Sequence, residues 1–288
     1  MTIPSLHKEE TPAESAGLPF AEALPLNDPK SGAGPAKAYA VKDDRYDYEA
    51  QGGKPPMAET VGEAQVMENL GWDPRTRKLF IQRVYTILAA QLMLTFVVSA
   101  FMSLHAPTQA YVLTHGWPMG LSMAASIVSI VALMCYKERE PLNMYLLWIF
   151  TFAEAFLVGS VVTMYCAAGY QGIVLEAVLL TGLIFIGLTC FTCRSKIDFS
   201  FMGAFLSMGL GALILWGFFA MIFGAQTGYV YALLGCIIFS GYILFDTWLI
   251  MEKLSPHEHV LAAIMLYLDI INLFLYLLQL LAESNRNN

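Results

Sequence analysis

Two aspartates near the C-terminus, Asp246 and Asp269, each lie inside a stretch of about twenty apolar residues. An ionised carboxylate within a bilayer costs several kcal/mol, so such a residue normally faces the interior of a helix bundle and has a partner there. The two stretches, 233–251 and 260–282, are separated only by a short polar link, which favours a helical hairpin. We therefore expect the two carboxyl groups to be neighbours that share a proton or hold a cation.

The depths of the two aspartates in the membrane are compatible with such a contact. At 1.5 Å per helical residue, Asp246 lies about 9 Å from Glu252 and Asp269 about 16 Å from Glu258. The depths differ by roughly one helical turn, so a direct or water-bridged contact is feasible. Two carboxylates at that separation cannot easily both ionise, and the pair is expected to titrate as a unit. From the residues alone, we expect a pair with one apparent pKa raised toward neutrality, able to share a proton or to hold a cation in an ion pathway.

The composition of the chain is that of a membrane protein. Of its residues, 57% are hydrophobic and 14% are charged, and the mean hydropathy is +0.57; soluble domains rarely show this. The net charge of −7 argues against a nucleic-acid partner. The five cysteines are scattered, and Cys190-x-x-Cys193 lacks the rest of a zinc or redox site. We expect no cofactor, no metal centre and no catalytic residue.

The long apolar runs predict the fold class: an all-α polytopic membrane protein with seven transmembrane helices and a central C-terminal helix. Each run is close to the ~20 residues needed to cross a ~30 Å hydrocarbon layer. Residues 1–70 contain eight of the thirteen prolines and no sustained apolar period, so we expect a disordered tail over residues 1–74. Residues 75–282 form the membrane domain, and 283–288 a short C-terminal tail. The expected spans are 79–104, 117–136, 141–164, 171–193, 198–223, 228–251 and 258–282.

The short loops predict the orientation of the chain. Three of them (KERE, RSKID and EKLSPHEH) contain five Lys or Arg residues, whereas the alternate loops contain none. Cytosolic loops are enriched in Lys and Arg. We therefore expect the N-terminus and these three loops in the cytosol, with the C-terminal tail on the opposite side.

Two glutamates within other spans are further candidates for the ion pathway. Glu154 lies in the third expected span and Glu176 in the fourth. Each either lines the pathway or is a protonated group hydrogen-bonded to a neighbouring helix. In the last span, 100° per residue places four polar side chains on one face, which suits a central helix: Asp269, Asn272, Tyr276 and Gln279.

Several segments resemble the Bax inhibitor / lifeguard family of membrane proteins. The segments are FSGYILFDTWLI and LSPHEHVLAAIMLYLDIINLFLYLLQLL, with YLLWIFTFAEAFLVG and GIVLEAVLLTGLIFIGLT before them. The resemblance covers about residues 75–282, and the two aspartates occur at the expected separation and in the expected order.

The resemblance implies a bundle in endoplasmic-reticulum, Golgi or vacuole-type membranes that leaks calcium in a pH-sensitive manner and suppresses cell death. It implies that Asp246 and Asp269 form the pH sensor, and that a basic residue, Lys137 or Arg139, latches one of them in the closed form. Glu176 matches an acidic position of the family. A glutamate that bacterial members carry in the second helix has no counterpart here, which leaves no confident calcium site.

Two other functional classes remain open from the sequence. A non-conducting regulator would bind membrane-protein partners in cell-death control, and its acidic groups would serve only the structure. An intramembrane aspartyl protease also uses two membrane aspartates. This chain, however, has FDTW and YLDI at these positions instead of the G-x-G-D and P-A-L signatures. We therefore expect that it is not an enzyme.

Overall fold

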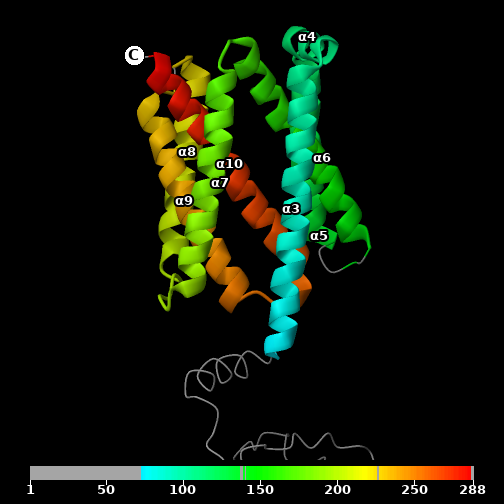
Figure 1. The fold of residues 1–288 in the computed structure, drawn as a ribbon, viewed down its shortest axis with the longest axis vertical. Helices are drawn as coiled ribbons and strands as arrows, with labels where there is room; N and C mark the ends of the chain where they lie inside the picture. The colour runs from blue at the N-terminus through cyan, green and yellow to red at the C-terminus, as the bar shows by residue number, and fades with distance from the viewer. Residues whose placement is uncertain (1–72, 137–138, 140, 226, 287–288) are drawn as a thin grey trace, which may run out of the picture. The chain divides into compact units, whose positions relative to one another are not determined.

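The computed structural model describes residues 73–136, 139, 141–225 and 227–286 (Figure 1). The described part consists of helices joined by short connections. In chain order these helices are α3 (Pro74–Leu104), α4 (Ala106–Thr114), α5 (Trp117–Tyr136), α6 (Leu142–Ala167), α7 (Gln171–Arg194), α8 (Met202–Phe223), α9 (Tyr229–Glu252), the 3-10 turn η1 (Pro256–Glu258) and α10 (His259–Arg286). The expected tail, residues 1–72, lies outside the described residues.

Seven of these helices are long and apolar enough to cross a membrane, which confirms the expected fold class. Their bounds follow the expected spans closely, with differences at both ends of the bundle. The first helix begins at Pro74 rather than 79, because Pro74 occupies the first helical position, where its missing N–H is not needed. The last helix continues to Arg286, which forms an ion pair with Glu283 one turn earlier (3.1 Å).

The short helix α4 was not expected, since residues 105–116 were predicted to be a loop. It starts after His105 with a proline in its first turn and lies at the end of α3 opposite to Pro74 (Figure 1). The aromatic side chains of Tyr111 and Trp117 are exposed and meet edge to face, with ring centroids 6.5 Å apart. Exposed Tyr and Trp are typical of the membrane–water interface.

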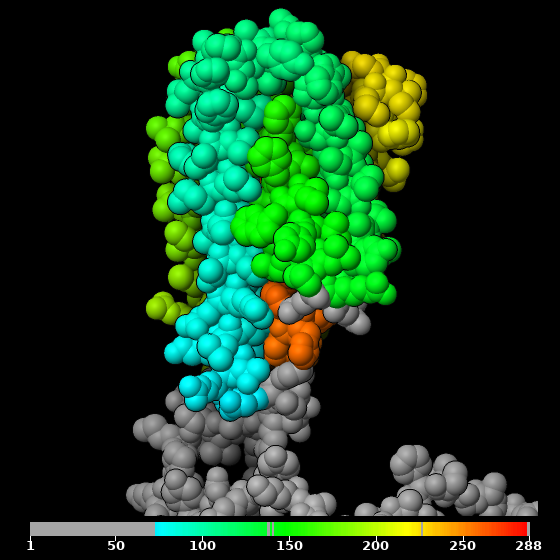
Figure 2. All heavy atoms as spheres, turned by 90° about the vertical axis from the view of Figure 1, so that its right-hand side faces the viewer, coloured from blue at the N-terminus to red at the C-terminus, as the bar shows by residue number. Residues whose placement is uncertain are grey.

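The C-terminal helix is central, as expected. It packs on α3, α6, α7 and α9, and 67% of its most apolar stretch is buried, against 11% for α7. Seen from the side, α3, α4, α5 and α6 cover one face of the bundle, and the orange start of the α10 region emerges at its lower edge (Figure 2). The buried apolar side chains therefore gather around α10.

The two helices that carry the aspartates approach each other closely. At Gly235 of α9, an added Cβ would lie only 2.3 Å from the ring of Tyr276 on α10. A side chain at this position would displace that ring, so glycine permits the close packing. The polar face of α10 points toward this contact: the hydroxyls of Tyr276 and Tyr231 are 3.3 Å apart, and Gln279 Nε2 donates to the Thr227 carbonyl (2.8 Å).

Candidate functional site: a buried pair of carboxyl groups

The hairpin formed by α9 and α10 brings Asp246 and Asp269 together. Both side chains are buried, with 4% and 6% of their surface exposed. Their carboxyl groups lie within hydrogen-bonding range of each other. Because a carboxylate has only acceptor oxygens, a hydrogen bond between the two groups requires a proton held by one of them. The expected neighbourhood of the aspartates is therefore observed, and its geometry is that of a shared proton.

Hydroxyl groups on α9 and on two other helices, α3 and α8, lie near the aspartate pair. The Tyr242 hydroxyl, on α9, lies within electrostatic range of both aspartates and is hydrogen-bonded to Ser207 of α8. Next to Asp246, Thr247 is fully buried and lies beside the Tyr85 hydroxyl of α3. These groups make the interior polar around the pair, while α8 and α3 connect it to the rest of the bundle.

Of the two candidate latch residues, Arg139 is exposed, unlike the buried aspartates. Lys137 lies outside the described residues. The guanidinium of Arg139 stacks on the ring of Tyr136, 5.5 Å from its centroid. Within the ranges that the structure describes, neither aspartate has a salt bridge to a basic side chain.

Arg77 is the basic side chain that contacts the aspartate hairpin, and the sequence interpretation missed this role. It is 3% exposed and lies on α3, from which its Nε donates to the carbonyl of Met251 (2.9 Å) and its Nη1 to that of Leu254. These carbonyls belong to the last turn of α9 and the link that follows, where a cation compensates the helix dipole. The sequence did contain a signal for this role. Arg77 precedes Phe80 and Val84, both buried, at helical spacing, and it therefore lies on the inward face of α3.

The two glutamates are not part of this pair. The half-buried Glu154 of α6 accepts a hydrogen bond from Ser126 Oγ of α5. Glu176 is exposed on α7. The Tyr267 hydroxyl lies within electrostatic range of Glu154 and is 2.8 Å from Thr95 Oγ. Tyr267 is two residues before Asp269, so the two side chains leave α10 in directions about 200° apart.

The described side chains contain no group of three or more His, Cys, Asp or Glu residues placed to hold a metal ion. The pair at Asp246 and Asp269 supplies carboxyl oxygens from two helices. A partly hydrated divalent cation can bind to one or two carboxylates. The arrangement is therefore suited to exchanging a proton and to attracting a cation in passage.

The chain belongs to the Bax inhibitor family of multi-pass membrane proteins. The family model described as "Inhibitor of apoptosis-promoting Bax1" matches residues 77–287. Protein lifeguard 4 of Mus musculus is 42% identical over 73% of this chain and 87% of its own length. The Golgi anti-apoptotic protein of Vaccinia virus (strain Lister) is 41% identical over the same shares. Bax inhibitor 1 of Schizosaccharomyces pombe is 38% identical over 74% of this chain and 80% of its own length.

Proposed function

We propose that this protein is a pH-sensitive calcium leak of an intracellular membrane, with Asp246 and Asp269 as its proton sensor. The observation that carries the proposal is the close approach of two buried carboxyl groups on the closely packed helices α9 and α10. A hydrogen bond between them exists only while the pair holds a proton. The protonation state of two side chains thus decides whether the helices are linked or repel each other at this point.

Removal of the shared proton would also change what the bundle interior attracts. Two carboxylates in a medium of low dielectric repel each other strongly and attract cations equally strongly. Rings or pairs of acidic side chains select cations in membrane channels. A pair buried between helices can therefore serve as a sensor and as part of the cation pathway.

The names of the relatives support a role in cell survival. One relative is a Golgi anti-apoptotic protein, and the family model is named for inhibition of an apoptosis-promoting protein. We propose that the calcium leak lowers the calcium content of an endoplasmic-reticulum, Golgi or vacuole-type store. This would link the aspartate pair to calcium homeostasis and to the control of cell death.

We also propose that the N-terminus faces the cytosol, because Arg77, near the start of α3, contacts the Lys253-containing link that follows α9, and cytosolic loops are enriched in Lys and Arg. A glycosylation tag inserted between residues 105 and 116 is expected to be modified in microsomes, whereas a tag within residues 1–70 is not. Modification of the N-terminal tag alone would show that the orientation is the opposite of the one proposed.

The central experiment is reconstitution of the purified protein in liposomes that contain a calcium-sensitive dye. Wild-type protein should release calcium at a rate that changes between about pH 5 and pH 8, the range accessible to coupled buried carboxyl groups. Asp246→Asn and Asp269→Asn keep the side-chain shape but remove the titrating group. Both variants should therefore leak at a rate that does not change with pH, while protein-free liposomes define the background.

The same experiment separates the leak from the alternative functions. A correctly folded wild-type protein that releases no calcium above the background would contradict the leak and favour a non-conducting regulator that acts through membrane-protein partners. We propose that the protein is not an enzyme, because the sequences around its aspartates differ from those of the intramembrane aspartyl proteases. Cleavage of a transmembrane peptide in these liposomes, abolished by Asp246→Asn, would contradict that proposal.

A further inference from the structure

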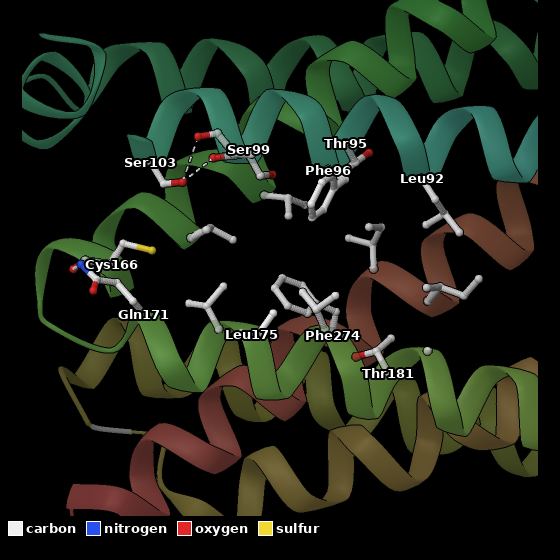
Figure 3. A pocket seen from close by; sticks show the side chains of 18 of the residues that line it. Leu92, Thr95, Phe96, Ser99, Ser103, Cys166, Gln171, Leu175, Thr181 and Phe274 are labelled. Atoms are coloured by element: carbon white, nitrogen blue, oxygen red, sulfur yellow. Dashed lines mark hydrogen bonds between the residues drawn. The ribbon is translucent and has the colours of Figure 1, made fainter. Parts of the chain in front are cut away.

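A cavity lies beside the aspartate hairpin, and its lining includes neither of the two aspartates. It has a volume of about 440 Å³ and is lined by α3 and α6 on one side and α7 on the other, with α10 as its floor (Figure 3). Since α3 packs on α6 and α10, and α7 on α9 and α10, the cavity is a cleft between two flanks of the bundle. We call it the α3–α7 cleft.

The α3–α7 cleft is elongated along the helices and opens sideways. On α3 its lining extends from Leu92 to Leu104, about 18 Å at 1.5 Å per residue. This is close to the depth of one leaflet, which is roughly half of the ~30 Å hydrocarbon layer. Phe96 and Leu175, on opposite walls, are 59% and 62% exposed. The opening therefore faces the acyl region of the bilayer.

The lining of the cleft is apolar and, over its described residues, uncharged. Phe96 of α3, Leu175 of α7 and Phe274 of α10 converge on its centre (Figure 3). Its polar groups lie mainly toward the end near α4, where Gln171 and Ser103 mark the membrane boundary. Deeper in the wall, Ser99 is 7% exposed, and its Oγ has no hydrogen-bond partner among the described residues.

We propose that the α3–α7 cleft binds the acyl chain of a bilayer phospholipid, which enters from the leaflet opposite to the Lys/Arg-containing loops. The length of the cleft, its sideways opening and its uncharged lining fit a hydrocarbon chain that remains attached to a headgroup at the surface. Gln171 and Ser103 lie where the ester region would be. A free fatty acid would bring a carboxylate, and the lining has no cation to pair with it.

The bound chain would contact the helix that carries the proton sensor. The floor of the cleft is formed by Ile270, Ile271 and Phe274 of α10, and Ile270 directly follows Asp269. A chain in the cleft would pack against α10 in the space between α3 and α7. The cleft thus offers a lipid site next to the sensor, although its occupancy does not depend on a calcium leak.

The glycines of α7 provide a matched test of the cleft. An added Cβ meets nothing within 4 Å at Gly182, which lines the cleft, nor at Gly187, which lies outside its lining. Gly182→Phe should fill the cleft, and Gly187→Phe places the same ring on the same helix elsewhere. The full-length protein is reconstituted in phosphatidylcholine nanodiscs containing a phosphatidylcholine with a diazirine in one acyl chain, then illuminated and analysed by peptide mass spectrometry.

We expect labelled peptides that contain Phe96, Leu175 or Phe274. Labelling of these peptides should fall by about tenfold in Gly182→Phe, because the ring displaces several methylene groups of the chain, and should persist in Gly187→Phe. Ala100→Phe tests the opposite wall in the same way, and thermal melting of each variant verifies its fold. Labels confined to outward residues such as Phe205, or equal labelling in Gly182→Phe and wild type, would overturn the proposal.

Two further arms test other occupants of the cleft. A diazirine-labelled free fatty acid, used in place of the labelled phospholipid, should label the cleft less than the phospholipid does. Labelling by the free acid alone would overturn the assignment to a phospholipid chain. Crosslinks between two copies of the protein at Phe96 or Leu175, instead of crosslinks to lipid, would assign the cleft to self-association and would also overturn it.

Discussion

Asp246 and Glu154 are both carboxyl side chains within membrane helices, but they meet different partners. Asp246 lies beside a second carboxyl, that of Asp269, between the closely packed helices α9 and α10. Glu154 accepts from a hydroxyl, that of Ser126, and lies between α5 and α6 at the periphery. The pair of carboxyl groups can hold one or two acidic protons, depending on pH. The Ser126 hydroxyl beside Glu154 keeps its proton and remains a donor at any physiological pH.

This comparison shows why a buried acid is not by itself a sensor. A carboxyl bonded to a serine hydroxyl keeps that hydrogen bond whether it is ionised or protonated, because the hydroxyl can donate or accept. A bond between two carboxyl groups is lost when the shared proton leaves. The structural consequence of titration should therefore be large at α9 and α10 and small at α5 and α6.

The largest expected effect is the loss of pH dependence after substitution of the pair. In the liposome assay, the leak of the double variant Asp246→Asn/Asp269→Asn should stay constant within about twofold from pH 5 to pH 8. The Glu154→Gln variant should retain the wild-type pH profile, because its substitution leaves the shared proton in place. If the Glu154→Gln variant alone lost the pH dependence of the leak, the sensor would be Glu154 on α6.

A smaller effect is expected on stability at the peripheral site. Ser126→Ala removes the hydroxyl that donates to Glu154. It should lower the free energy of unfolding by about 1 kcal/mol, within the range measured for hydrogen bonds between membrane helices. Unfolding in mixed detergent micelles measures this change, with Ser207→Ala, at the Tyr242 contact of the sensor region, as the comparison. An unchanged stability would mean that water replaces the hydroxyl.

The smallest effect concerns the contact between the Thr95 and Tyr267 hydroxyls near Glu154. Thr95 Oγ donates to the carbonyl of Gln91 (2.9 Å), so in its 2.8 Å contact with Tyr267 the tyrosine hydroxyl is the donor. Tyr267→Phe removes one hydrogen bond and leaves Thr95 bonded, which should cost about 0.6 kcal/mol. The pH profile of the leak should not change. A shifted profile would show that the hydroxyls couple Glu154 to the aspartates.

The periodicity and polarity of the last two spans were sufficient to predict the aspartate contact. Burying Asp246 and Asp269 in a membrane costs free energy unless the two side chains contact each other. The short link between the two spans leaves few other arrangements. The central position of α10 also followed from its polar face, since Asp269, Tyr276 and Gln279 recur at helical spacing. In these cases the free-energy cost of exposing a polar side chain to lipid indicated that the side chain points into the bundle.

Other features could not be predicted because their cause lies in tertiary contacts. Arg77 precedes the first expected span, and nothing in the local sequence indicates that its partners are the carbonyls of Met251 and Leu254. The helical conformation of residues 106–114 was missed because their polar and apolar residues resemble those of a loop. The same two roles were predicted for Glu176 as for Glu154, either lining the ion pathway or forming a hydrogen bond to a neighbouring helix. The structure shows that Glu176 faces outward on α7.

The contact made by Arg77 has a consequence for the order in which the bundle is assembled. Its hydrogen-bond partner Met251 lies 174 residues later in the chain, so the contact cannot form until nearly the whole membrane domain has been synthesised. During that time the guanidinium needs other partners, such as water or lipid headgroups at the membrane surface. The first spanning helix to be made can therefore reach its final depth and rotation only after the sixth has been inserted.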